Sequence, residues 1–237
     1  MAIQERLVEY KDGEILLEAY MAWEESANAR PGVLISHAWG GRGELEENKA
    51  AQLAELGYVG FALDLYGKGV KGSNPEQNRA LMQPLLDDRE MLQRRMKLAL
   101  ENLRRQKEVD DDRIAAMGFC FGGLCVLDLA RTGADIRGAA SFHGLFSAPG
   151  NTAGNTITAK ILVMHGWDDP MATPDQVLSL AEELTSMGAD WQIHAYGNTL
   201  HAFTNPAAND REHGTVYDAD ADRRSWQSLQ LFLAEIF

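Results

Sequence analysis

The stretch RIAAMGFCFGGLCVLDLA, residues 113–130, decides the fold of this chain. An apolar run typical of a buried strand ends at Met117, and a helical pattern begins at Leu124. A turn this sharp between strand and helix holds its central residue, Cys120, in a strained conformation. The two elements cross so closely that neighbouring residues must be nearly free of side chain. The glycines at 118, 122 and 123 meet that requirement.

A cysteine at such a turn is well placed for chemistry. The turn lifts the sulfur of Cys120 above the sheet edge at a helix N-terminus, where backbone N–H groups favour a thiolate. The other interpretation is a buried, inert cysteine beside glycines that are there for packing, and one short motif does not separate the two. The rest of the chain has to decide between them.

Length and composition describe an ordinary globular chain. With 237 residues it is long enough for one large α/β domain, and we expect residues 1–237 to form a single domain. Lys and Arg total 22 against 35 Asp and Glu, so the formal net charge of −13 repels nucleic acid and anionic membranes. The N-terminus lacks a signal-peptide pattern, and no apolar stretch reaches about 18 residues. We therefore expect a cytoplasmic protein with neither nucleic-acid nor membrane partners.

The cysteines and histidines show no metal-binding pattern. Cys120 and Cys125 lie five positions apart, which is neither a C-x-x-C pair nor a pair joined across a long loop, so no structural disulfide is expected. The six histidines have no ligand-like spacing. The sequence predicts no metal and no cofactor, and it does not indicate the oligomeric state.

Alternating apolar runs and helical patterns predict an α/β protein. Residues 7–10 and 15–23 flank Lys11-Asp12-Gly13, a hairpin signal, so the chain should open with two antiparallel strands. Further strands are expected at 33–36, 59–63, 114–117, 139–142, 161–165 and 191–196. Helices are expected at 45–56, within 85–107, and at 124–131, 174–187 and 223–236. Strands that alternate with helices predict a mainly parallel sheet covered on both faces.

An acid and a base follow Cys120 in the order that hydrolases of this architecture use. The expected strand 161–165 leads into GWDDP at 166–170, and the strand 191–196 leads into GNTLHAF at 197–203. In α/β-hydrolases the nucleophile, the acid and the histidine come in this order along the chain, each on a loop after a strand.

With these motifs in place, the chain resembles the dienelactone hydrolase family of α/β-hydrolases. The resemblance rests on GFCFGG, HGWDDP, HAF, FALDLYGKG at 61–69 and RSW at 224–226. It implies a three-layer sandwich and a Cys-Asp-His triad that opens lactones and esters through a thioester. Cys120 is then the nucleophile, His201 the base and Asp169 the acid. Asp168 is the reserve acid, since Asp169 could be only a turn residue before Pro170.

The resemblance also implies oxyanion donors, for which we expect the backbone N–H groups of Phe121 and Ala38. In dienelactone hydrolase itself a glutamate in the Ala38 loop takes part in activating the cysteine, and His37 stands at that position. His37 could tune the thiol, or it could only satisfy loop backbone groups.

Departures from the family and the apolar residues near the strand ends bear on the substrate. The type enzyme holds a carboxylate with an arginine shortly after its histidine, where this chain has Thr204-Asn205-Pro206. Arg42 could replace that arginine or could simply face solvent. A pocket wall is expected from residues near the strand ends: Trp39, Phe119, Phe121, His143 and Trp167. No large lid is expected, because the segment 144–159 is short and rich in small polar residues, and this favours a small substrate.

Three functions follow from these observations. The first is a cysteine-dependent hydrolase of small carboxylic esters or lactones. The second is a redox-sensing thiol protein in which Cys120 is oxidised and Cys125 resolves it, although five residues along a helix place Cys125 past the first turn. The third is a non-catalytic ligand-binding module on a hydrolase fold.

Overall fold

A computed structural model of the protein describes residues 2–26 and 28–237. The chain forms two compact units, one up to Met117 and one from Gly118 to Phe237. The boundary falls near the end of strand β5 (Val109–Phe119). The expectation of a single domain stays a prediction.

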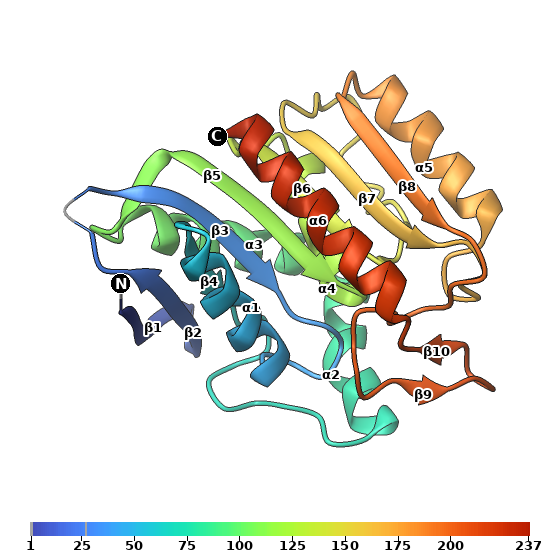
Figure 1. Ribbon diagram of the computed structural model, residues 1–237, viewed down its shortest axis with the longest axis horizontal. Coiled ribbons are helices and arrows are strands. Elements are labelled where there is room, and N and C mark those ends of the chain that lie inside the picture. The colour runs from blue at the N-terminus through green and yellow to red at the C-terminus, as the bar shows by residue number, and fades with distance from the viewer. Residues whose placement is uncertain (1, 27) are drawn as a thin grey trace. The chain divides into compact units, whose positions relative to one another are not determined.

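The first unit is a five-stranded sheet with three helices (Figure 1). Its strands run in the order β1-β2-β4-β3-β5, with β1 antiparallel to β2, β2 antiparallel to β4, and β3 parallel to β4. The remaining strands are β1 (Ile3–Asp12), β2 (Ile15–Glu24), β3 (Arg30–Ser36) and β4 (Val59–Ala62). The helices are α1 (Glu44–Glu55), α2 (Pro75–Asp87) and α3 (Arg89–Arg104).

Helices α1 and α3 cover opposite faces of that sheet. A Cβ on Gly60 would lie 2.5 Å from the backbone of Ala50 in α1, and a Cβ on Gly32 would lie 3.1 Å from Leu103 in α3. Gly60 pairs with Val33, the neighbour of Gly32, and successive residues of a strand point to opposite faces. The absence of side chains at these two glycines allows both helices to pack closely.

The second unit has the parallel strands β6 (Gly138–Phe142), β7 (Lys160–Gly166) and β8 (Trp191–Tyr196), in that order (Figure 1). Its helices are α4 (Phe121–Arg131), α5 (Pro174–Ser186) and α6 (Ala219–Ile236), and a short hairpin joins β9 (Asn209–Asp210) to β10 (Thr215–Val216). Gly138 closely approaches Phe232 of α6, whereas Ser141 meets Gly123 of α4. Residues three apart on a strand face opposite ways, so α6 and α4 lie on opposite faces of β6.

The predicted α/β fold, with a mainly parallel sheet and an antiparallel N-terminal hairpin, is confirmed. Strand β8 has the predicted bounds, and β1 begins four residues earlier than predicted. The long helix expected within 85–107 is confirmed as α3, which begins after Asp88, whose side chain accepts the Met91 N–H at 2.9 Å. Helix α2 was not predicted. Within the described residues, no helix is long and apolar enough to cross a membrane.

Candidate active site

Cys120 occupies the strained turn between β5 and α4. Its backbone has φ 55° and ψ −116°, and its N–H donates to Phe142 O at 3.0 Å. The thiol is partly exposed at the N-terminus of α4. A Cβ on Gly118 would lie 2.1 Å from Gly122 O, and one on Gly123 would lie 2.7 Å from the Gly144 Cα. This is the geometry of a nucleophile elbow, in which close crossing of strand and helix requires glycine.

Asp169 and His201 form a buried hydrogen-bonded pair. His201 Nδ1 donates to Asp169 Oδ2 at 2.7 Å, and both side chains are almost fully buried. The second carboxylate oxygen, Oδ1, accepts the Met171 N–H at 2.7 Å, so it cannot turn away without losing a bond. Asp168 is exposed, and its backbone N–H donates to Thr199 O at 3.0 Å. Of the two adjacent carboxylates, Asp169 is the one that orients the imidazole.

Two backbone hydrogen bonds hold His201 in place. Its N–H donates to Gly214 O at 2.9 Å, and its carbonyl accepts the Val216 N–H at 3.0 Å, which ties it to the β9–β10 hairpin. Gly166, at the end of β7, has no side chain, so the backbone just before His201 can pack closely against the loop that carries Asp169. A Cβ on Gly166 would lie 2.5 Å from Thr199 O and 2.7 Å from Leu200 O. The loops of acid and base are therefore packed backbone against backbone.

The charges around His201 favour its protonated form. Burial opposes a positive charge there, yet the Cys120 thiolate and the hydrogen-bonded Asp169 outweigh it and raise the pKa of His201 to about 10. His201 Nε2 is buried and makes no hydrogen bond of standard geometry to any residue that the structure describes, although the sulfur attracts it. The arrangement can hold a thiolate–imidazolium pair, which is the reactive form of a cysteine nucleophile.

Two further histidines surround this pair. His143 follows β6 and packs edge-on against His201, with ring centroids 5.1 Å apart. His165, in β7, is fully buried, and neither ring nitrogen has a hydrogen-bond partner among residues 2–26 and 28–237. Burial, and after it the charge of His201, lowers the pKa of His143. Burial also lowers the pKa of His165, although Asp169 acts to raise it and outweighs the smaller lowering effect of His201. The cluster therefore keeps these two rings neutral beside a charged His201.

Backbone strain marks the same loops. Among the described residues, the non-glycine positions with positive φ are Cys120, His143, Asn198 and Ala202. They lie at the turn before α4, next to β6, and in the loop that carries His201. Such conformations cost about 1–3 kcal/mol each and cluster at functional sites.

In the first unit, His37 and Ala38 form hydrogen bonds with other residues of that unit. His37 Nδ1 donates to Ala38 O at 2.7 Å, and its Nε2 accepts the Leu65 N–H at 3.2 Å, so the ring is a neutral tautomer that links two loops. Burial lowers the pKa of His37, although the Ala38 carbonyl and Asp64 act to raise it. The Ala38 N–H donates to Glu46 Oε1 at a long 3.3 Å. Of the two interpretations of His37, these contacts support the structural one.

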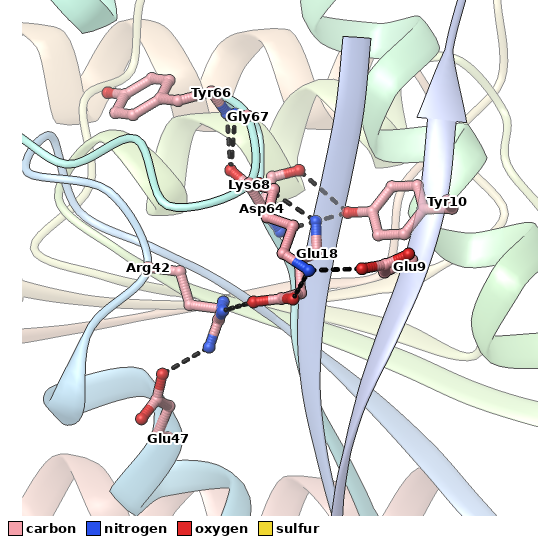
Figure 2. Close-up of polar contacts among 9 residues, drawn as sticks. All are labelled: Glu9, Tyr10, Glu18, Arg42, Glu47, Asp64, Tyr66, Gly67 and Lys68. Carbon is pink, nitrogen blue, oxygen red and sulfur yellow. Dashed lines mark hydrogen bonds and ion pairs between the residues drawn. The ribbon is translucent and has the colours of Figure 1, made fainter.

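Arg42 is buried and paired rather than facing solvent (Figure 2). It contacts Glu18 at 3.0 Å and also pairs with Glu47. Lys68 pairs with Glu18 at 2.9 Å and with Glu9. The guanidinium charge is therefore already balanced by two carboxylates within the unit, and this network fastens the loop after β3 to β2.

The aromatic residues expected in a pocket wall differ in exposure. Trp167 is 42% exposed in the loop that carries Asp169, whereas Phe119 and Phe121 are fully buried at either side of Cys120. The Trp39 carbonyl accepts the Tyr66 hydroxyl at 2.9 Å. Of Trp167, Phe119 and Phe121, only Trp167 is exposed.

The described residues contain one group of carboxylates close enough to share an ion: Asp110, Asp111 and Asp112. The last two are exposed at the start of β5, and such groups are common without a metal. Sequence reasoning missed Thr204, Gly214 and Met171, which hold His143, His201 and Asp169. No motif marks them, because their contacts come from loops that meet only in the fold.

The chain is similar to several known proteins. A crystal structure of a dienelactone hydrolase-like promiscuous phosphotriesterase from metagenomic libraries matches it with a TM-score of 0.93 and 35% identity, covering 100% of both chains. A probable 2-oxo-3-(5-oxofuran-2-ylidene)propanoate lactonase from Bradyrhizobium sp is 26% identical over 227 residues, 91% of this chain and 88% of that protein. An uncharacterized protein from Caenorhabditis elegans is 37% identical over 149 residues, 62% of this chain and 94% of that protein. The family model of dienelactone hydrolases matches residues 17–237, so the chain belongs to the dienelactone hydrolase family, as its motifs predicted.

Proposed function

We propose that the protein hydrolyses a small carboxylic ester or lactone, with Cys120 as nucleophile, His201 as base and Asp169 as the acid that orients it. The observation that carries this proposal is the buried 2.7 Å bond from His201 to Asp169, in the same unit as the strained Cys120 turn. The family and the lactonase relative support the reaction class.

The reaction runs in two steps. The Cys120 thiolate attacks the carbonyl carbon, and collapse of the tetrahedral intermediate breaks the C–O bond while the imidazolium of His201 gives its proton to the leaving alkoxide. A thioester remains. His201, now neutral, takes a proton from water, the hydroxide attacks the thioester, and the carboxylic acid leaves as the thiolate–imidazolium pair is restored. Asp169 stabilises the charged imidazole throughout and does not itself take the proton.

The developing oxyanion requires donors, and we propose the Phe121 N–H for this role. The Ala38 N–H, in the first unit, stays a prediction from the sequence. Removing one such donor from a hydrolase costs roughly 2.7–4 kcal/mol of transition-state stabilisation. The Ala38 N–H donates to Glu46 Oε1 at a long 3.3 Å.

The charges of the first unit support a substrate without a carboxylate. Arg42, which could have bound such a group, is paired with Glu18 and Glu47. The segment after His201 reads Thr204-Asn205-Pro206, without an arginine. Exposed Trp167 favours an apolar acyl or alcohol part. A cytoplasmic location, and the absence of nucleic-acid and membrane partners, stay predictions.

Phosphotriester hydrolysis is a second candidate activity. It rests on the 35% identity, over the whole chain, to the promiscuous phosphotriesterase. The same thiolate would attack phosphorus in place of carbon, and His201 would again protonate the leaving group.

A panel of small esters, lactones and phosphotriesters, read by product release and by intact mass, tests the proposal. We expect the parent to accumulate an acyl adduct on Cys120, and Cys120→Ala to lose both adduct and turnover while remaining folded. The other thiol supplies the control, since Cys125→Ala should keep activity. Turnover that survives in Cys120→Ala would refute the nucleophile. A Cys120–Cys125 disulfide after mild peroxide, with no adduct from any substrate, would favour the redox alternative.

A further inference from the structure

His143 is held in an unusual conformation by the loop after β6. Its φ is 37°, a left-handed value that costs energy for any residue with a side chain. Its N–H donates to Met164 O at 2.8 Å, and its ring is buried. The loop therefore holds the buried ring through a backbone conformation that is costly for a residue with a side chain, and this conformation determines where the ring points.

The ring is aimed between His201 and the residues that follow it. It packs edge-on against His201 at 5.1 Å and an interplanar angle of 67°, and against Phe203 at 5.0 Å and 82°. His143 Nε2 lies 2.8 Å from the buried hydroxyl of Thr204. His143 thus contacts the proposed base directly and, through Thr204, the backbone three residues further on.

The hydrogen bonds select one tautomer of His143. Its Nδ1 is buried and has no hydrogen-bond partner among the residues described. A buried N–H without a partner is more costly than a buried lone pair without one. The proton therefore sits on Nε2 and is donated to the Thr204 hydroxyl, and Nδ1 carries only a lone pair.

The charges around His143 keep it in that neutral state. Four titratable groups act on it or on its neighbours: Cys120, His165, Asp169 and His201. Burial and a charged His201 both disfavour a proton on His143 Nδ1. One positive charge is thus confined to His201, where it faces the sulfur and the Asp169 carboxylate.

We propose that His143, fixed by Thr204, is a positioning residue that holds the His201 ring in line with Asp169 and Cys120. This inference rests on the proposed function for the role of His201. A phenylalanine at 143 would fill the space but could not bond Thr204. The hydrogen bond is therefore the part of the contact that specifies orientation, and an error of about 1 Å in such a group can cost up to a hundredfold in rate.

Four variants test the proposal. Thr204→Val removes the hydroxyl at nearly constant volume, and His143→Phe removes the ring nitrogens. His143→Gln can still donate to Thr204 and should rescue part of the loss. The matched control is Thr199→Val, because Thr199 is equally buried in the same loop but its hydroxyl bonds only to the nearby Gly197 O at 3.2 Å.

Two readouts separate positioning from packing. The first is the pH of half-maximal iodoacetamide alkylation of Cys120, mapped by peptide mass without substrate. The second is kcat and KM on an ester that the panel identifies. We expect Thr204→Val and His143→Phe to move the alkylation midpoint up by about half a pH unit or more and to lower kcat about tenfold with KM nearly constant. The double variant should be no worse than His143→Phe, because both changes remove one link.

Unchanged midpoints in Thr204→Val and His143→Phe, with only their melting temperatures lowered, would overturn the proposal. So would a His143→Gln variant as impaired as His143→Phe, or a Thr199→Val control that shifts equally. Because alkylation needs no substrate, the two proposals can fail separately. A shifted midpoint with no turnover on any ester would leave the positioning role standing and refute the hydrolase.

Discussion

A single methyl group added at Gly166 should push the loop that carries Asp169 away from the backbone just before His201. Its Cβ in Gly166→Ala would lie 2.5 Å from Thr199 O and 2.7 Å from Leu200 O, both backbone atoms just before His201. Ordinary contact requires these atoms to retreat by about 1 Å. Overpacking of this kind costs about 1–3 kcal/mol of stability, and misplacing a reacting group by that distance costs up to about a hundredfold in rate. We expect kcat to fall between tenfold and a hundredfold.

The assay pairs ester turnover with urea denaturation, and Gly197→Ala is the matched control. Gly197 lies in the same loop as His201, and a Cβ there meets nothing within 4 Å. It should therefore leave both turnover and stability nearly unchanged. Parental kcat and stability in Gly166→Ala would refute the claim that the close backbone packing sets the geometry of Asp169 and His201. Equal losses in both variants would point instead to a general sensitivity of the loop.

Three further outcomes are expected. Asp169→Asn should lower kcat by about three to four orders of magnitude, because an amide holds the imidazole in the wrong tautomer, whereas Asp168→Asn should stay within about twofold; steady-state kinetics would show the reverse ranking if the assignment is wrong. Glu18→Gln should destabilise the fold by about 2–3 kcal/mol in chemical denaturation, since it leaves a buried guanidinium underpaired, and a loss below about 0.5 kcal/mol would contradict this. The raised pKa of His201, about 10, contributes stability that is fully present below about pH 6.5 and is lost as pH rises toward 10. The fall in unfolding free energy between pH 7 and pH 9.5 should shrink in Cys120→Ala, and an unchanged fall would argue against the ion pair.

Sequence patterns predicted the strands and the elbow well because those features are local. The strand pattern of residues 191–196 is contained in those residues alone, and the structure has β8 with the same bounds. Helix α2 escaped prediction because Pro84 lies inside it and Leu85 is its one buried residue, so it has little apolar periodicity.

The candidate site was only partly predictable, for a related reason. The sequence predicts a nucleophile, an acid and a base in that order, but the choice of Asp169 over Asp168 depends on which carboxylate the fold turns toward His201. Arg42 looks like a solvent-facing loop residue, and it is buried because Glu18, on a strand 24 positions earlier, lies against it. Contacts between residues so distant in sequence leave no local pattern.

The left-handed backbone at Ala202 creates a conflict for protein engineering. Its φ of 57° costs a side-chain-bearing residue about 1–2 kcal/mol, and glycine would avoid that cost while losing about 0.5–1 kcal/mol through its greater freedom in the unfolded chain. Selection for heat resistance would therefore favour Ala202→Gly. Selection for fast turnover would favour the alanine, whose methyl group limits the conformations open to the loop beside His201. A library screened for melting temperature alone would therefore enrich Ala202→Gly, the change expected to lower turnover.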